Sequence, residues 1–416
     1  MSAGPPLERR LGTGDAVVVG LGAMLGAGVF AAFGPAAATA GSLLLLGLGI
    51  AAVVATCNAL SSAQLAAVHP ASGGTYVYGR RQLGAFWGHL AGFGFVVGKT
   101  ASCAAMALTF GSYALPGSGR PLAVAAVVAL TAVNLRGVQK TARLTRLLVG
   151  LVLLALAAVV VAALAGGTAS TDGLRATDGV GAYDVLQSAG LLFFAFAGYA
   201  RIATLGEEVR DPTRTIPRAI PIALAAVLAV YALVAVSALL AVGPAVLAGS
   251  TAPLASVVEA GDLSWLSPAV RVGGALAALG VLLSLLVGVS RTAFAMARER
   301  ELPRWLDAVH PVHRVPHHAE LAVAAAVVVL VLLVDLRGAI GFSSFAVLVY
   351  YAVTNASALT LRADQRRYPR AVAVVGLLGC VLLAATLPLT SVALGVAVLA
   401  AGSIVFAVRH RASPRR

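Results

Sequence analysis

Glycines crowd the first apolar stretch of the chain, where the backbone rather than the side chains could do chemistry. Four of them, Gly20, Gly22, Gly26 and Gly28, fall within nine residues, which is a poor composition for a continuous helix. A helix that breaks leaves amide N–H groups unpaired, and these groups with the positive end of the next half-helix suit a carboxylate. Inside a membrane such a break is tolerated where it is buried in protein or lines a cavity. The stretch therefore predicts a site for a carboxylate.

Two other interpretations of the glycine stretch compete with a binding site. Gly22 and Gly26 are four residues apart, the spacing of small residues that lets two membrane helices pack closely. On spacing alone, close packing and a binding break are equally supported. A dinucleotide-binding loop is also glycine-rich, but the spacing here is GxGxxxGxG and no soluble βαβ unit follows. We therefore reject a nucleotide site.

A second apolar stretch, 183–209, has the same character and favours the binding break. Aromatic and small residues surround Gly198, and the sequence then turns polar at Arg201, Glu207 and Glu208. Secondary transporters have interrupted helices at corresponding places of an inverted repeat. A second interrupted span, five helices after the first, is what a five-plus-five repeat predicts. Its halves would be 15–165 and 183–361, with 371–408 as two additional helices.

The elements that must position these residues are membrane spans. Hydrophobic residues make up 60% of the 416 and charged residues 11%, against about 45–50% and 25% in soluble domains. A soluble globule of this composition would lack polar surface, and a disordered chain needs lower hydrophobicity. A spanning helix needs about 20 apolar residues. Cutting at charged or Pro/Gly-rich breaks predicts twelve spans, at about 15–38, 42–67, 85–115, 122–135, 144–165, 183–209, 220–242, 266–297, 319–334, 340–361, 371–387 and 391–408.

The positive charges test this topology, because cytoplasmic loops collect Lys and Arg. With the N-terminus inside, 24 of the 30 Lys and Arg residues fall on the cytoplasmic side, and only Arg120, Arg175, Arg271 and Arg337 fall outside. One missed span would invert every later loop, so this bias supports an even count with both termini in the cytoplasm. It also explains the net charge of +14 without nucleic acid. Because the loops are short, 1–416 is expected to be a single transmembrane domain.

Five groups of motifs, in order along nearly the whole chain, resemble the amino acid–polyamine–organocation superfamily of permeases, of the bacterial amino acid permease type. They are GLGAMLGAGVF at 20–30 with GPA at 34–36; PASGGTY at 70–76; FFAFAG at 193–198 with EEVRDP at 207–212 and TIPRAI at 215–220; SR at 290–291 with MAR at 296–298 and LP at 302–303; and FSSF at 342–345 with Tyr350, Tyr351 and Asn355.

The resemblance implies an all-α polytopic membrane protein of LeuT-like fold, with broken helices 1 and 6 in a five-plus-five inverted repeat. It implies amino acid transport across the cytoplasmic membrane by alternating access, with a proton as the expected coupling ion and neither cofactor nor metal. In the family, the substrate carboxylate meets the unwound first helix and the α-ammonium meets carbonyls of the unwound sixth. These positions correspond here to Ala23, Met24, Leu25, Gly26, Ala27 and Gly28, and to Phe194, Ala195, Phe196, Ala197 and Gly198.

One departure from the family pattern concerns the coupling residue. Proton-coupled members similar to this chain often carry a lysine in the fifth span, where this sequence has Val152. Lys99 lies instead near the middle of the third span, where a charge costs about 2.5–3.5 kcal/mol on insertion scales. A buried lysine can release its proton near physiological pH, whereas arginine stays charged. We therefore favour proton coupling or substrate sensing by Lys99 over a structural lysine bonded to backbone carbonyls.

The remaining candidates leave alternatives open. Arg201, Glu207 and Glu208 are gate candidates, and a static scaffold is an equally supported role. A carrier or exchanger of polyamines or small amines is the alternative substrate class. An ion channel would need charged rings or a repeated pore-lining set, and an enzyme would need paired carboxylates, histidine clusters or a nucleophile within the spans. No channel pattern appears, the spans contain almost no carboxylates, and the sequence has no Walker motif for ATP-driven transport. The lack of a fixed acidic residue in the pocket favours neutral over cationic substrates, and the oligomeric state is left open.

Overall fold

The computed structural model describes residues 11–69, 73–137, 142–203 and 209–412, and these fold almost entirely into α-helices. In those ranges the only extended pairing is an isolated parallel bridge between Leu11 and Val209. The expected all-α class is confirmed.

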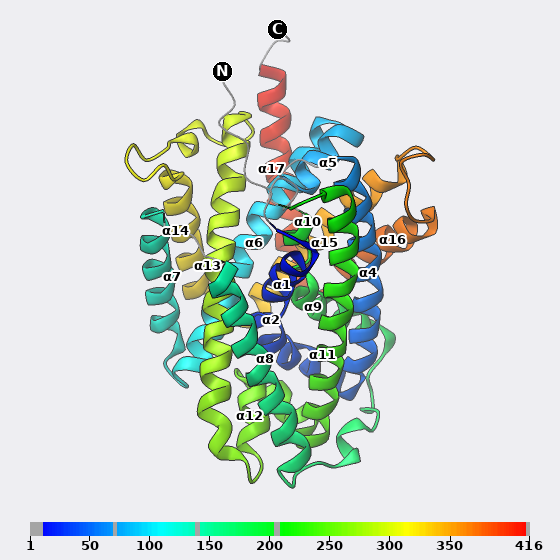
Figure 1. Cartoon of the computed structure of the whole chain (residues 1–416), viewed down its shortest axis with the longest axis vertical. Helices are drawn as coiled ribbons and strands as arrows, with labels where there is room; N and C mark the ends of the chain where they lie inside the picture. The colour runs from blue at the N-terminus through cyan, green and yellow to red at the C-terminus, as the bar shows by residue number, and fades with distance from the viewer. Residues whose placement is uncertain (1–10, 70–72, 138–141, 204–208, 413–416) are drawn as a thin grey trace.

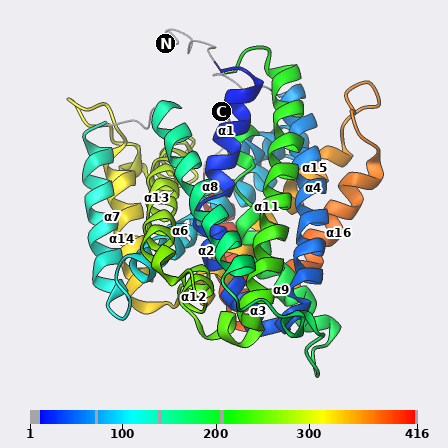
Figure 2. The ribbon, with the colours of Figure 1, turned by 60° about the horizontal axis from the view of Figure 1, so that its bottom comes forward.

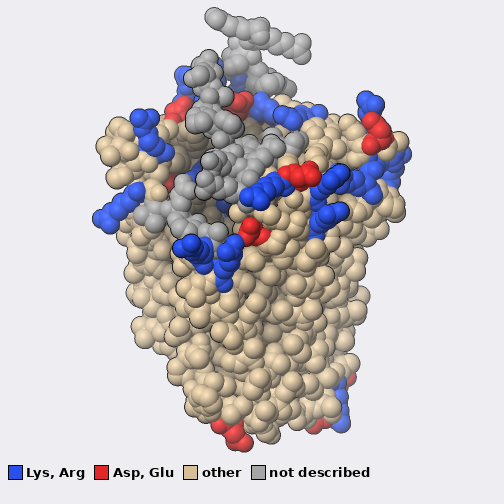
Figure 3. All heavy atoms as spheres, in the orientation of Figure 1, with Lys and Arg blue, Asp and Glu red and all other residues tan. Residues whose placement is uncertain are grey.

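Eight segments of the described chain are long and apolar enough to cross a membrane. Their outward faces suit lipid rather than water, because large side chains such as Leu154 (68% exposed) and Ile404 (63%) lie on the surface. Figure 3 shows a broad band without charged side chains between the two ends of the molecule. The eight segments contain α1 (Thr13–Met24) with α2 (Ala27–Ala31), α3 (Phe33–Ala40) with α4 (Leu44–Val68), α6 (Ala85–Ala114), α8 (Ala142–Ala165), α11 (Pro212–Gly249), α13 (Ser267–Arg298), α15 (Leu336–Leu359) and α17 (Leu389–Ala412).

Four further apolar helices are shorter, with 15 to 17 residues each. They are α7 (Gly119–Leu135), α9 (Ala182–Phe196), α14 (His317–Leu333) and α16 (Arg370–Thr386). Each of the twelve segments expected to span thus coincides with an apolar helix, although length and composition alone qualify eight. Short helices lie between them, namely α5 (Thr75–Gln82), α10 (Ala200–Ala203) and α12 (Pro253–Glu259).

The predicted boundaries of two spans are wrong. The seventh span was expected from residue 220, yet α11 begins at Pro212, because a proline in the first turn gives up an N–H that has no helical partner anyway. α11 also continues past residue 242, through a kink at Gly243 (φ 69°). The sixth span was expected to run to residue 209. Its described helical part ends at Ala203, and Val209 is instead paired in the bridge.

The interrupted helices lie at the centre of the bundle (Figures 1 and 2). α1 and α2 pack against α8, α9, α11 and α13, and α9 packs against α4 and α15. α7 and α14 pair along one flank beside α6 and α13, while α16 covers the opposite flank beside α4 and α15. The breaks are therefore surrounded by protein on all sides rather than by lipid.

Basic side chains gather at one end of the molecule, the end at which α1 begins and α17 ends (Figures 1 and 3). At this end Glu301, which follows α13 and is 4% exposed, joins three helices. Its carboxylate accepts a hydrogen bond from Arg80 Nη1 of α5 at 2.7 Å and lies 3.4 Å from Nδ1 of His89 in α6. The other ring nitrogen of His89 lies 3.2 Å from the Gly402 carbonyl of α17. Burial, reinforced by Glu301, raises the pKa of the neighbouring Tyr76 hydroxyl, which accepts a hydrogen bond from Arg80 Nη1 at 2.9 Å.

The Glu301→Ala variant should be measurably less stable. Removal of the buried carboxylate deprives Arg80 and His89 of a shared partner, and hydrogen bonds to charged groups contribute about 1.5–3 kcal/mol. Glu299→Ala is the matched control, because Glu299 is 56% exposed on its side chain and 3.6 Å from Arg80, and such surface pairs contribute about 0–1 kcal/mol. Thermal unfolding in detergent measures both. Equal melting temperatures for the two variants would contradict the structural role of Glu301.

Candidate functional site

The first interrupted helix breaks after Met24. α1 closes with the Leu25 N–H donating to the Leu21 carbonyl at 2.7 Å, and α2 begins at Ala27. Between them Gly26 has extended backbone (φ −77°, ψ −152°) and stands at the N-cap of α2 without a side-chain cap. The first N–H groups of a helix have no partner inside it. The break therefore presents amide donors together with the positive end of a short helix.

The second break follows Phe196, the last residue of α9. Ala197, Gly198 and Tyr199 form a turn before α10 begins at Ala200. The N–H groups of Ala197 and Tyr199 reach carbonyls three residues back at 3.4 and 3.5 Å, which is long for a hydrogen bond. The turn therefore presents carbonyl oxygens that the helix does not use fully.

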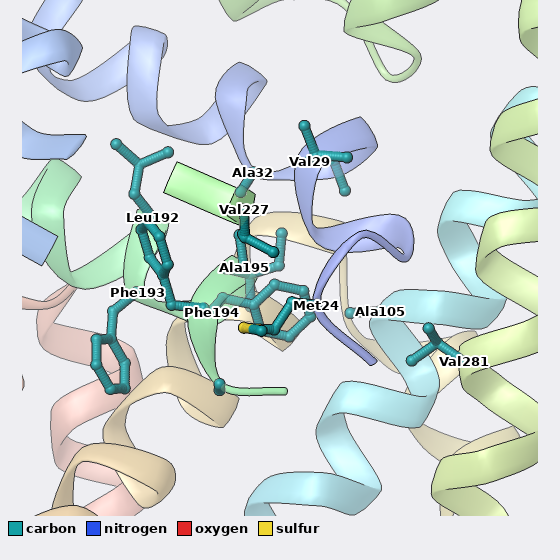
Figure 4. Close-up of a cluster of buried hydrophobic side chains, with 14 of the residues drawn as sticks. Met24, Val29, Ala32, Ala105, Leu192, Phe193, Phe194, Ala195, Val227 and Val281 are labelled. Carbon is teal, nitrogen blue, oxygen red and sulfur yellow. The ribbon is translucent and has the colours of Figure 1, made fainter. Parts of the chain in front are cut away.

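The two breaks touch each other (Figure 4). A Cβ atom added at Gly198 would lie 2.4 Å from the Ala23 carbonyl oxygen, and one added at Gly28 would lie 2.7 Å from the Ala195 Cα. Neither contact can be relieved by a side chain, because the atoms it meets are backbone. Glycine is therefore required at both positions by close approach, and amide donors of one break lie beside carbonyls of the other.

Tyr231 of α11 bridges the two breaks. Its buried hydroxyl lies within hydrogen-bond distance of the Met24 carbonyl at the end of α1 and 2.9 Å from the Ala195 carbonyl of α9. The sequence analysis missed this residue. The available signal was a lone tyrosine in an otherwise aliphatic span, 220–242, since a buried tyrosine hydroxyl usually has a hydrogen-bond partner.

Lys99 reaches the second break from α6. Its Nζ donates to the Ala197 carbonyl at 3.4 Å, and the Tyr351 hydroxyl of α15 reaches the same oxygen at 3.5 Å. Tyr351 also stacks on Tyr199, with ring centroids 5.0 Å apart. A hydrogen bond to a backbone carbonyl is the contact expected of a structural lysine. Because this carbonyl belongs to the second break, the same contact is also the one expected of a functional lysine.

The structure places the residues expected to bind substrate in and beside the two breaks. Met24, Leu25, Gly26 and Gly28 of the first set are buried, as are Phe194, Ala195, Phe196 and Ala197 of the second. Ala23 and Gly198 form the closest contact between the sets. Of Ala27 only the backbone is described. In Figure 4 the Met24 side chain lies beside Phe194, between the two interrupted segments.

Of the gate candidates, one lies within the described part of the chain. Arg201 is exposed in α10, and Glu207 and Glu208 lie outside the described residues. At the same end, Arg146 of α8 donates to Asp15 of α1, and the Arg210 N–H donates to the Leu11 carbonyl at 2.8 Å. The beginning of α1 is thus tied to two other segments.

Val152, which stands where related proton-coupled carriers often have lysine, lies against the first break. It lines a cavity of about 20 Å³ together with Leu25 and Gly26 of the break and Ala277 and Gly280 of α13. A cavity of this size holds about one water molecule. The apolar side chain of Val152 therefore stands at the position where those carriers have a lysine amine.

A wider vestibule of about 630 Å³ opens at the basic end of the molecule. α5 contributes Tyr76 and Arg80 to its wall, and α13 contributes Phe294 and Arg298, each aromatic ring lying beneath a guanidinium group. As for metals, the described ranges contain no group of three His, Cys, Asp or Glu side chains placed to hold an ion.

Membrane-length apolar helices around two buried helix breaks define a polytopic membrane protein. The amino acid permease family matches residues 11–408, and the chain belongs to this family, within the amino acid–polyamine–organocation superfamily. A Mycobacterium tuberculosis protein named as an uncharacterized transporter is 64% identical over 406 residues, covering 97% of this chain and 92% of its own. A branched-chain amino acid permease of Bacillus subtilis is 26% identical over 389 residues (88% and 83%), and human cationic amino acid transporter 4 is 28% identical over 391 (87% and 61%).

The Gly198→Ala variant should lose substrate binding. The new Cβ would force the two breaks apart, and overpacking of this kind costs about 1–3 kcal/mol, equivalent to a fall in affinity of about five- to a hundredfold. Gly150→Ala is the control, because a Cβ at Gly150 of α8 meets nothing within 4 Å. Binding by purified protein in detergent measures the effect, with size-exclusion chromatography to verify folding. Wild-type affinity in Gly198→Ala would show that the junction of the breaks is not the binding site.

Proposed function

We propose that the protein is a secondary active transporter that moves amino acids across the cytoplasmic membrane by alternating access. The observation that carries this proposal is the contact between two interrupted helices, α1–α2 and α9–α10, at the buried centre of an otherwise continuous bundle. An interrupted backbone is costly in a membrane, and secondary carriers place such breaks at the substrate site. Membership of a permease family supports the same conclusion.

The substrate's two charged groups match the two breaks. The α-carboxylate binds the amides at 26–28, where the N-terminus of α2 is positive, and the α-ammonium binds carbonyls at 194–198. Both ionic groups are thus held by dipoles of the backbone, and the pocket needs no permanent charge for the zwitterion. The Met24 and Phe194 side chains form an apolar part of the wall beside these backbone groups.

In this proposal all twelve apolar helices cross the membrane, 15–165 and 183–361 are inverted halves of a LeuT-like fold, and 371–408 is an addition. The basic end faces the cytoplasm, because Lys and Arg collect on that side. Both termini then lie in the cytoplasm, and the vestibule between α5 and α13 is the cytoplasmic part of the path. Movement of the half-helices at the breaks, against the fixed helices around them, alternates access.

Proton coupling through Lys99 is part of the same proposal. The amine contacts the second break, so its charged and neutral forms change the electrostatics of the carbonyls that receive the substrate. The Val152 cavity beside the first break offers no ionisable group. Lys99 is then the ionisable side chain among the described residues that can link protonation to the site directly.

Purified protein in liposomes should accumulate a labelled amino acid without ATP, and an inward proton gradient should accelerate uptake. The experiment is a panel of radiolabelled amino acids and polyamines, with and without an imposed pH gradient, and protein-free liposomes as the control. Uptake that requires ATP would refute the secondary-carrier proposal. If polyamines are taken up and amino acids are not, the substrate class is polyamines rather than amino acids.

Lys99→Met should abolish acceleration by the pH gradient while counterflow exchange is partly retained, because methionine keeps the apolar stem and cannot titrate. Lys99→Arg should lose the acceleration as well, since arginine does not release its proton in this range. Initial uptake rates at equal and unequal pH measure the effect. Wild-type gradient dependence in Lys99→Met would make the residue structural and place the coupling group elsewhere.

A further inference from the structure

The second break already holds an ammonium group that the chain supplies. Of its carbonyls, Ala195 accepts from the Tyr231 hydroxyl, and Ala197 accepts from Lys99 Nζ. The Ala197 oxygen lies among the carbonyls that would receive the α-ammonium of an amino acid. A substrate that bound there would have to displace the lysine, whose charge would then need another partner.

No carboxylate of the described residues pairs with Lys99. Its one polar contact is the Ala197 carbonyl, and Cys103, one turn further along α6, is the ionisable group that acts on it. Carboxylates form ion pairs elsewhere, toward the two ends of the molecule, as in Asp15–Arg146, Glu259–Arg271 and Glu301–Arg80. A buried charge without a counter-ion is unfavourable, and among the described residues a protonated Lys99 has no carboxylate that balances its charge.

We propose that Lys99 selects the substrate by charge, and that the protein prefers amino acids with a second carboxylate, such as glutamate and aspartate. This inference rests on the proposed function and names its substrate class. A neutral zwitterion adds one positive and one negative group, and it leaves the lysine unpaired once the Ala197 carbonyl is taken. An acidic amino acid brings one further negative charge, which is the counter-ion that Lys99 lacks.

Substrate binding then takes the form of an exchange of partners. Lys99 Nζ leaves the Ala197 carbonyl and pairs with the side-chain carboxylate of the substrate. The freed carbonyl, which Tyr351 still reaches at 3.5 Å, accepts a hydrogen bond from the substrate's α-ammonium. The α-carboxylate lies against the amides of the first break. If Lys99 takes up its proton in the same step, the proton and the anionic substrate cross the membrane as an electrically neutral pair.

Among the described residues no carboxylate pairs with Lys99, and the other cation beside the second break is the exposed Arg201 of α10. α13, which packs against α6, carries no ionisable side chain from 272 to 290. The tyrosines that face the break are un-ionised at neutral pH. The titratable groups on the elements around the break are Cys103 on α6, Tyr350 and Tyr351 on α15, Tyr231 on α11, Tyr199 in the break itself, and exposed Arg201 on α10.

The first test compares isosteric pairs in wild-type protein. Initial uptake of labelled glutamate against glutamine, and of aspartate against asparagine, is measured in proteoliposomes with an inward pH gradient. Each pair differs by a charge and hardly in shape. We expect the acidic member to be favoured by about tenfold or more, because an unpaired buried charge discriminates strongly between ligands. Equal uptake, or preference for the amides, would overturn the inference.

The second test uses three variants to separate charge from titration. Lys99→Met should reduce the acidic-to-amide ratio about tenfold or more, to near one or below. Lys99→Arg should retain the preference for acidic substrates, because its charge remains, while it loses acceleration by the pH gradient. Arg120→Met, which removes an exposed cation from α7, should match wild type in both measurements. An unchanged ratio in Lys99→Met would overturn the inference.

A neutral reference substrate distinguishes failure of the inference from failure of the proposed function. If labelled leucine is carried without ATP and glutamate is not, the protein is an amino acid carrier and the charge selection is wrong. If no amino acid of the panel is carried or exchanged, the proposed function fails and the inference with it. The acidic-to-amide uptake ratios of the wild-type protein test the charge selection by themselves. The inference can therefore be overturned even if a Lys99 variant folds poorly.

Discussion

The structure depends on one constraint, which is that a backbone amide or carbonyl in an apolar environment needs a partner. Most of the chain meets it with helices. At two places the helices stop, between Met24 and Ala27 and between Phe196 and Ala200, and the freed groups become the most polar feature of the centre. Three surrounding helices each contribute one side chain that donates a hydrogen bond to a freed carbonyl. These side chains are Tyr231 from α11, Lys99 from α6 and Tyr351 from α15.

The glycines at the breaks allow the two backbones to approach each other closely, and this matters more than their conformational freedom. Gly198 and Gly28 have ordinary backbone angles, and what excludes a side chain there is the backbone of the other break. This contact places donors of one break beside acceptors of the other, so a ligand with both a carboxylate and an ammonium fits the junction better than either break alone. In the proposed transport cycle, a movement of α1 relative to α9 would therefore change this junction directly.

The helical bundle and the two breaks could be predicted from the sequence, because apolar length and glycine content mark them. Apolar length predicted each helix, and the glycine spacing predicted the break after Met24. The spacing could not separate close packing from a binding break, and the structure contains both, since Gly26 packs on Val281 of α13 while it caps α2. Tyr231 and Glu301 were missed because their roles depend on partners 36 to 221 residues away. The start of α11 was misplaced because three prolines, Pro212, Pro217 and Pro221, looked like a break rather than a helix beginning.

The arginines and the buried lysine have different surroundings and different roles. Arginines hold the two ends of the molecule together, where each has a carboxylate or a carbonyl and contact with water, as Arg80, Arg146 and Arg271 do. At the centre the chain uses lysine, which can lose its proton and has a single compact ammonium head. An arginine at that depth would stay charged and demand a permanent partner. A lysine bonded to one carbonyl can give that carbonyl up when a ligand arrives, provided that the ligand takes over its charge. The lack of a fixed acidic residue in the pocket by itself points only away from cationic substrates. It takes on a sharper meaning if Lys99 at the break selects by charge, as proposed: the missing negative charge is one that the substrate can bring.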